Sequence, residues 1–428
     1  MPDYSDTILP PLLSRKSPFL SDGNDLVLPD NTGHSLCNVP GTVSKLLNGP
    51  ELSAPALNQE ILDKFEGRYR NVILLLVDAL GYDHLQRLMA AGKAGFWKEN
   101  LNRASLFPLT SICPSTTASA LTTLWTGTEP AQHGYIGYEM WLKRYSMVVN
   151  TILHMPASYF GDAGSLTKSG FVPESFLGLK PLGVQFAERG IESHAFLPYS
   201  IGGSGLSRMH LEKASVHGYV AESDMWANLR DLLNTPARGA RFLYVYWSTL
   251  DSLIHRYGPD DARVNNQFSD LSRSLEVNLL GGLEKSVREK TLLLLTADHG
   301  AIATPVHEKY NLSKHPDFLR MLQMLPTCEA RLPFLFIKPG LEAEVRAYFA
   351  NSWPGQFTLL SIEEALSMRL FGAGEEHPEL RDRLGDLIVV SRGDAYLWWP
   401  DKPNVMQARH GGLHRLEMLI PLYALPLG

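Results

Sequence analysis

The stretch that decides the fold is Val72-Ile73-Leu74-Leu75-Leu76-Val77, which is followed directly by Asp78. All of its side chains are apolar, whereas a strand with one face in water alternates apolar and polar residues. A strand that is apolar on both faces is typical of the centre of a parallel sheet, because helices cover both sides of such a sheet. The stretch therefore predicts a central strand that ends at an aspartate.

The same pattern recurs further along the chain. Residues 242–247 and 292–295 are apolar runs of the same kind, and a shorter version covers 194–197. Segments with helical periodicity lie between the runs. This alternation of strand and helix predicts an α/β fold of the doubly wound type, with a mostly parallel central sheet flanked by helices.

The remaining segments predict the division into domains. Residues 1–66 are rich in proline and show little periodicity, so we expect an extended N-terminal arm with a short helix at 59–65. Residues 67–303 and 403–428 are expected to form an α/β core that binds metal, because all of the candidate metal ligands fall within these ranges. Residues 304–402 mix strand and helix patterns without the alternation, and we interpret them as a smaller α+β cap inserted into the core.

Composition excludes several classes of function. The 428 residues include 39 Lys or Arg and 45 Asp or Glu, a formal net charge of −6. This balance argues against nucleic acid as a stable partner and against an anionic membrane surface. The three cysteines are scattered, so they predict neither a disulfide framework nor a cysteine zinc site. We expect no signal peptide and a cytoplasmic location, and the oligomeric state stays open.

The residues that follow the apolar runs carry the chemistry, because ligands of open α/β sheets bind at the carboxyl ends of the strands. Asp78, Asp251 and Asp298 each follow one run, and His255 and His299 accompany two of them. Singly, such residues are helix caps or surface ion pairs. Carboxylate oxygen and imidazole nitrogen at convergent strand ends are instead what Zn²⁺ or Mn²⁺ requires. Together they predict a metal site.

Two metal ions would divide these ligands naturally. One group consists of Asp78, Asp298 and His299, and the other of Asp251, His255 and His410. Two ions about 4 Å apart can clamp both oxygens of an in-line displacement at phosphorus.

Such a site also needs a nucleophile. The segment 114–127 contains three adjacent hydroxyl residues and opens a helix of small residues, where a hydroxyl would face a bound phosphate. Capping of that helix is the alternative role for Ser115 or Thr116.

The order of these blocks resembles the alkaline phosphatase superfamily, and most closely its type I phosphodiesterase/nucleotide pyrophosphatase branch. The resemblance spans residues 71–422, with 304–402 poorly covered. The blocks that carry it are Val77-Asp78-Ala79, Thr117 with Thr126-Gly127, Asp251-x-x-x-His255, Asp298-His299-Gly300 and His410-Gly411-Gly412.

The resemblance implies which hydroxyl is the nucleophile. In the superfamily the nucleophile precedes the penultimate residue of the helix motif by nine positions. Counting back nine positions from Thr126 gives Thr117. The resemblance therefore implies that Thr117 is the catalytic residue and also a metal ligand. Thr116 is the main alternative. Tyr138 stands near the place where the family commonly has a phosphate-binding Asn, so it is the candidate substrate-binding residue and leaves nucleotide specificity open.

The resemblance therefore implies a metal-dependent phosphoric-ester hydrolase, most of all a phosphodiesterase/nucleotide pyrophosphatase with a covalent phospho-threonine intermediate. Two Zn²⁺ ions are expected, with Mn²⁺ as the alternative, and the substrate is a small-molecule phosphate ester or diester. A phosphomonoesterase, or a phosphomutase or phosphotransferase of the same superfamily, is a second reading. A non-catalytic metal-binding module is a third.

Two observations bear on the substrate. A monoesterase needs a cation near phosphorus, and none adjoins the motifs, although Arg144 or a cap residue could supply one. Aromatic residues near the motifs could stack on a base or an apolar leaving group, or could simply be core. These aromatic residues are Tyr135, Tyr138, Trp141, Tyr159 and Phe160.

Overall fold

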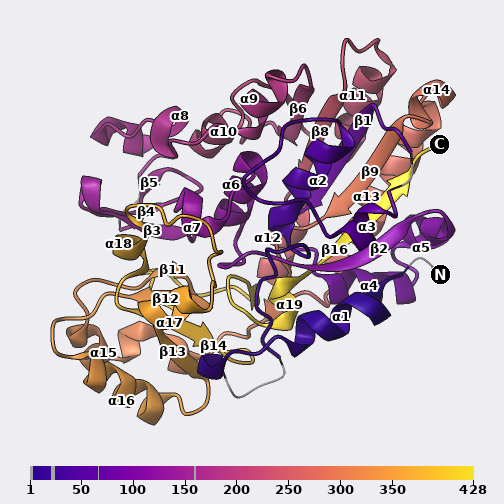
Figure 1. The fold of residues 1–428 in the computed structure, drawn as a ribbon. Helices are drawn as coiled ribbons and strands as arrows, with labels where there is room; N and C mark the ends of the chain where they lie inside the picture. The colour runs from indigo at the N-terminus through magenta and orange to yellow at the C-terminus, as the bar shows by residue number, and fades with distance from the viewer. Residues whose placement is uncertain (1–2, 21–24, 66, 159–160) are drawn as a thin grey trace.

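A seven-stranded sheet forms the centre of the molecule in this computed structural model, which describes residues 3–20, 25–65, 67–158 and 161–428 (Figure 1). Strands β7, β6, β8, β1 and β9 are parallel neighbours, and β16 runs antiparallel between β9 and β2. In spatial order the strands are β2 (Ser105–Thr110), β16 (Leu419–Pro426), β9 (Thr291–Thr296), β1 (Asn71–Val77), β8 (Arg241–Trp247), β6 (Glu192–Pro198) and β7 (Ala214–Tyr219). The predicted doubly wound, mostly parallel α/β fold is confirmed.

Burial follows the apolar runs. Every residue of β1, β8 and β9 is buried, as expected for central strands covered on both faces. Two groups of helices, each packed within itself, cover the sheet. One consists of α2 (Val39–Leu46), α6 (Thr117–Thr126), α9 (Leu182–Ala187) and α10 (Gly205–His210), and the other of α4 (Tyr82–Ala90), α5 (Gly95–Glu99), α11 (Glu222–Asn234), α12 (Thr249–Tyr257) and α13 (Ala262–Ser274).

A second, antiparallel sheet lies beside the core (Figure 1). Its spatial order is β13 (Phe357–Ser361), β14 (Leu387–Ser391), β12 (Leu332–Leu335), β11 (Thr327–Glu329), β3 (Glu139–Leu142), β4 (Met147–Asn150) and β5 (Met155–Pro156). Its helices include α15 (Pro316–Met321), α16 (Glu342–Ser352), α17 (Ile362–Ser367) and α18 (Leu380–Leu384). Residues 139–156 were expected within the core, yet they extend this sheet, because β3 pairs with β11. The division into domains as a whole stays a prediction.

The N-terminal segment has more helix than its proline content indicates. The expected short helix is α3 (Gln59–Leu62), but α1 (Ser5–Ser14) and α2 precede it. Helix α1 contains Pro10 and Pro11, which remove backbone donors, and it survives because buried Ile8 and Leu12 pack it against the sheet at β2. Among the described residues, none of the helices combines the length and the apolar character that crossing a bilayer requires.

A buried ion pair joins the second sheet to the core. Arg331, between β11 and β12, places Nη2 2.7 Å from Oε2 of Glu417 in α19 (Arg415–Met418), and neither side chain is exposed. The guanidinium also donates to the carbonyl oxygens of Gly393 and Ala395, and Glu417 Oε1 accepts the amide of Gly412 at 2.9 Å. The pair therefore ties both sheets to the loop that follows His410.

Replacing one partner of this pair tests its role. We expect Arg331→Met to lower the free energy of unfolding by about 3–5 kcal/mol, because Glu417 would remain buried without its partner. The matched control is Arg346→Met, since the Arg346–Glu342 pair is solvent-exposed and contributes at most about 1 kcal/mol. Urea titration measures both changes. Equal losses in the two variants would contradict the structural role of Arg331.

Candidate metal centre

The carboxyl ends of β1, β8 and β9 bring the predicted residues together. Asp78 directly follows β1, Asp298 follows β9 by two residues, and Asp251 lies in the first turn of α12 after β8. His255 lies one turn further along α12. Because β1 lies between β8 and β9 in the sheet, the three carboxylates meet at one edge.

His410 reaches this edge through a short two-stranded sheet. Strand β10 (Ile302–Ala303) follows Asp298, and it pairs with β15 (Ala408–Arg409). His410 is the residue after β15, so this pairing carries it back to the segment that contains Asp298. A residue distant in the sequence thereby joins the strand-end carboxylates.

The first predicted group is compact and buried. His299 Nε2 lies 3.5 Å from Asp78 Oδ1 and 3.4 Å from Asp298 Oδ2. Thr117 Oγ1 lies 3.2 Å from the same nitrogen. The structure thus brings Asp78, Asp298, His299 and Thr117 to one point.

The second predicted group lies next to the first. Asp251 Oδ1 is 3.3 Å from His255 Nε2 and 3.9 Å from His410 Nε2. The rings of His410 and His299 stack with centroids 3.7 Å apart. Possible ligand atoms of Asp251, His299 and His410 all lie within 4.8 Å of one another, so His299 lies between the two groups rather than in the first alone.

Each histidine is oriented by its second ring nitrogen. The Nδ1 atoms of His255, His299 and His410 lie 2.9 Å, 3.0 Å and 3.1 Å from backbone carbonyl oxygens. A carbonyl only accepts hydrogen bonds, so Nδ1 carries the proton and Nε2 keeps its lone pair. This is the arrangement by which proteins prepare imidazole for a metal ion.

The carboxylates each present one oxygen without a hydrogen bond. Among the described residues, Asp78 Oδ1, Asp251 Oδ1 and Asp298 Oδ2 are buried and lack a hydrogen-bond partner. The other oxygen is held in two of them: Tyr246 donates to Asp78 Oδ2, and the amides of Ala79 and His299 donate to Asp298 Oδ1. Buried polar atoms are normally paired, so three such oxygens facing imidazole lone pairs fit divalent cations.

The electrostatics agree with this fit. Burial raises the pKa of Asp78 well above its usual value, and the nearby carboxylates of Asp298 and Asp251 raise it further. Burial lowers the pKa of His410 well below its usual value, and His299 and His255 add to the effect. His410 is therefore neutral near pH 7, as a ligand must be, and a cation would offset the repulsion among the carboxylates.

The three adjacent hydroxyls at the start of α6 have different partners. Ser115 Oγ donates to the carbonyl oxygen of Gly412 at 2.8 Å, and Thr116 Oγ1 donates to the Glu329 carboxylate. Thr117 is the first residue of α6, and its hydroxyl alone among the three lies against His299. The helix ends at Thr126 and is followed by Gly127, whose positive φ of 66° suits glycine.

The structure also places the residues considered for substrate contact. Tyr138 is 37% exposed, and burial of its hydroxyl together with the charges of Glu329 and Glu139 raises its pKa. Tyr135 is core, with 1% exposure. Trp141 is partly buried, and Tyr159 and Phe160 lie outside the described residues.

Glu329, next to the nucleophile segment, was missed by sequence reasoning. It lies on β11 of the second sheet, outside every motif, and no sequence signal marks it.

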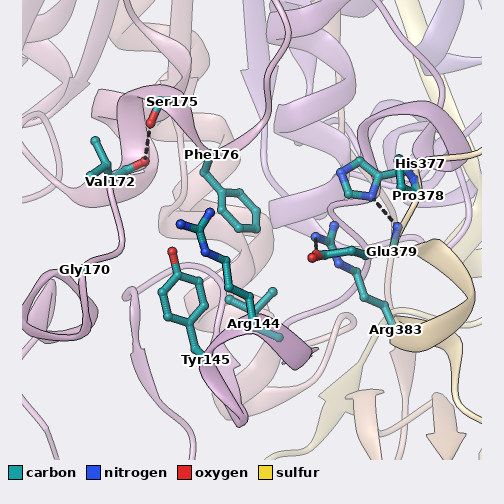
Figure 2. A pocket seen from close by; sticks show the side chains of 11 residues that line it. Arg144, Tyr145, Gly170, Val172, Ser175, Phe176, His377, Pro378, Glu379 and Arg383 are labelled. Atoms are coloured by element: carbon teal, nitrogen blue, oxygen red, sulfur yellow. Dashed lines mark hydrogen bonds and ion pairs between the residues drawn. The ribbon is translucent and has the colours of Figure 1, made fainter.

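Arg144, considered as a cation for a monoester, lies elsewhere. It lines a cavity of about 330 Å³ with Tyr145, Phe176, His377 and Arg383 (Figure 2). Its guanidinium points between the rings of Tyr145 and Phe176. None of the predicted ligands is among the described residues that line this cavity.

Comparison with known proteins shows which family and which solved structures the chain is similar to. The profile of the family described as type I phosphodiesterase / nucleotide pyrophosphatase matches residues 72–413. No match of significance is found among curated proteins.

Several solved structures share the fold. Human ectonucleotide pyrophosphatase/phosphodiesterase 5 superposes with a TM-score of 0.62 at 14% identity, covering 83% of this chain and 87% of that chain. The murine protein has a TM-score of 0.60 at 15% identity, with coverages of 82% and 87%, and an inactive form of it was solved with AMP. Phosphonoacetate hydrolase from Sinorhizobium meliloti 1021, solved with phosphonoformate, has a TM-score of 0.57 at 17% identity, with coverages of 84% and 91%.

The unpartnered carboxylate oxygens predict the metal content. Purified protein loaded with Zn²⁺ and then desalted is expected to retain about two ions per chain by elemental analysis. Asp251→Asn should reduce this to about one, because Asp78 and Asp298 remain for the other ion. Asp270→Asn, which removes an exposed carboxylate outside the site, is the matched control and should retain both. Unchanged content in Asp251→Asn would show that Asp251 is not a ligand.

Proposed function

The chain belongs to the type I phosphodiesterase/nucleotide pyrophosphatase family of the alkaline phosphatase superfamily, and from this premise we propose that it is a two-metal phosphodiesterase with Thr117 as its nucleophile. Membership of this family supports the general activity of a phosphoryl-transfer hydrolase. The finer assignment rests on the residues of this chain.

One observation carries the proposal. Three buried carboxylate oxygens without hydrogen-bond partners face histidine Nε2 atoms, and the Thr117 hydroxyl adjoins them. A structural cluster would pair these oxygens internally, because an unsatisfied buried acceptor costs about 1–3 kcal/mol. A solved murine relative supports the choice of a threonine, since its inactive form carries alanine in place of one threonine.

The ligand chemistry supports Zn²⁺, with Mn²⁺ as the alternative. We propose one ion held by Asp78, Thr117, Asp298 and His299, and a second held by Asp251, His255 and His410. When bound, the ions supply positive charge that favours ionised Thr117 and stabilises the charge developing on the phosphoryl oxygens.

The remaining steps belong to the chain's own residues. Thr117 Oγ1, having lost its proton, attacks phosphorus in line, and the bond to the leaving oxygen breaks so that an alcohol or phosphate departs with a proton. Water then attacks the same phosphorus and restores the Thr117 hydroxyl. The hydroxyls of Ser115 and Thr116 donate to Gly412 and Glu329 instead, so neither is the hydroxyl that contacts His299.

A small phosphodiester is the substrate class that the charges support. The two arginines nearest in sequence to His410 have other partners: Arg409 donates to Thr304, and Arg415 pairs with Asp83. A dianionic monoester, with one charge more than a diester, would lack a compensating arginine there. The AMP bound to the murine relative supports a small phosphate ester as the ligand.

We also propose a cytoplasmic location. All three cysteines are free, buried thiols, which suits a reducing compartment.

Substitution of the nucleophile is the direct genetic test. Thr117→Ala should lower kcat for bis-p-nitrophenyl phosphate by roughly a thousandfold or more, because Thr117 is the one of the three adjacent hydroxyl residues that contacts His299. Thr116→Ala is the matched control and should retain most of the activity. A large loss in Thr116→Ala together with near-normal turnover in Thr117→Ala would transfer the role to Thr116.

Substrate charge gives a separate prediction. Zn²⁺-loaded protein should hydrolyse bis-p-nitrophenyl phosphate with a kcat/KM at least about tenfold above that for p-nitrophenyl phosphate. The monoester carries a second negative charge that would lie near the carboxylates of the site without a compensating arginine, and like charges placed together cost several kcal/mol. Release of p-nitrophenolate measures both rates. A preference for the monoester would indicate a phosphomonoesterase instead.

A further inference from the structure

The cavity that contains Arg144 is a feature that the proposed function does not use. It is lined by residues 142–145 at the turn between β3 and β4, by residues 170–176, and by residues 377–383, which lead into α18 (Figure 2). Its volume of about 330 Å³ lies at the lower end of the range of cavities that bind small molecules. None of the predicted metal ligands is among its described lining residues. The cavity is therefore a separate feature of the chain.

Arg144 brings a positive charge to this cavity that no acidic side chain offsets. Among the described residues, its guanidinium has neither an ion pair nor a hydrogen bond. The group points between the rings of Tyr145 and Phe176 (Figure 2), and its Cζ lies 5.8 Å from the Tyr145 centroid. An aromatic face attracts a cation but leaves its N–H donors without acceptors. These donors are available to an anion.

Arg383 fixes a second wall of the cavity. Its side chain is only 2% exposed. The guanidinium donates from Nη1 to the carbonyl oxygen of Gly134 at 2.7 Å and pairs with Glu379. Its Cζ lies 5.5 Å from the centroid of Phe176, which is also the ring beside Arg144. This wall is therefore held in place before any ligand binds, which reduces the entropic cost of binding.

His377 adds a neutral hydrogen-bond donor. Its Nδ1 accepts the backbone amide of Glu379 at 3.1 Å. Burial lowers the pKa of His377, and the charge of Arg383 acts in the same direction, so the ring is neutral near pH 7. A neutral imidazole whose Nδ1 accepts a hydrogen bond carries its proton on Nε2. That Nε2 has no hydrogen-bond partner in the part of the chain that the structure describes.

The charges around the cavity leave one positive charge over. Arg383 and Glu379 neutralise each other, and His377 is neutral. The neighbour of Arg144 in the chain, Lys143, is paired with Asp382, so this aspartate is not a partner for Arg144. A ligand with a single negative charge would restore the balance, as a carboxylate does. A phosphate monoester, with close to two negative charges, would leave part of its charge uncompensated.

We propose that this cavity is a binding site for a small aromatic carboxylate. Its acid group pairs with the Arg144 guanidinium, whose planar fork of donors matches the two oxygens of a carboxylate. Its ring packs against Tyr145 and Phe176, and His377 Nε2 donates to the same acid group. This site goes beyond phosphodiester hydrolysis, and neither proposal depends on the other.

A purely structural role of Arg144 makes a different prediction. If the guanidinium only packs against the aromatic rings, a carboxylate and an uncharged amide of the same shape would bind equally well or not at all. An amide keeps a planar group with a carbonyl acceptor but has no negative charge. Comparison of the two therefore separates anion recognition from simple filling of a cavity.

The test uses 4-bromobenzoate and 4-bromobenzamide as matched probes. In calorimetric titration of metal-loaded protein, the carboxylate should bind at least about tenfold more tightly than the amide, because only the carboxylate offers a charge to Arg144. Arg144→Met should bring the dissociation constant of the carboxylate close to that of the amide. Arg189→Met, which removes an exposed arginine outside the cavity, is the control and should keep the preference. An unchanged melting temperature of Arg144→Met excludes unfolding as the cause.

Crystals of the metal-loaded protein soaked in 4-bromobenzoate give the position of the ligand, because bromine scatters anomalously. We expect a bromine peak in the cavity, with the carboxylate on Arg144 and the ring beside Tyr145 and Phe176. A peak at the metal centre alone, the absence of any peak, or equal affinities for the carboxylate and the amide would overturn the proposal. A preference that persists in Arg144→Met would overturn it as well.

Discussion

The structure depends on three carboxylates that share one edge of a sheet. Asp78 and Asp298 are buried and Asp251 is partly buried. Burial, together with repulsion from the other two carboxylates, raises the pKa of Asp78. A fold does not keep such an arrangement for stability, because uncompensated buried charge is costly. The oriented histidines and the unpartnered oxygens are both explained if the arrangement exists to hold cations, which is why the proposed chemistry starts from it.

The surrounding architecture serves this edge. The parallel register of β8, β1 and β9 aligns the strand ends, and the pairing of β10 with β15 returns His410 to them. The second sheet is fastened to the same loop by the Arg331–Glu417 pair, which also holds the amide of Gly412. As a result, side chains of the second sheet, such as Glu329, lie beside the candidate metal centre.

The core of the fold and the residues that meet at its strand ends could be predicted from the sequence because their signals are local. An apolar run that ends in aspartate marks both a central strand and the carboxylate at its end. The family indicated by those blocks is confirmed by the match over residues 72–413. The joining of β3 to β11 could not be predicted, since antiparallel pairing between distant segments leaves no periodic signal. Helix α1 was missed because its prolines favour extended structure, whereas tertiary packing decides its conformation. Glu329 belongs to no motif, and only the fold brings it to Thr116.

The central claim is that Thr117 carries the phosphoryl group between the two chemical steps. The most direct measurement is to mix metal-loaded protein with bis-p-nitrophenyl phosphate, quench in acid before one turnover is complete, and map the adduct by tandem mass spectrometry. The account predicts a phosphoryl adduct on Thr117 whose amount matches the burst of p-nitrophenolate. An adduct on Ser115 or Thr116, or a burst without any adduct on this segment, would contradict it.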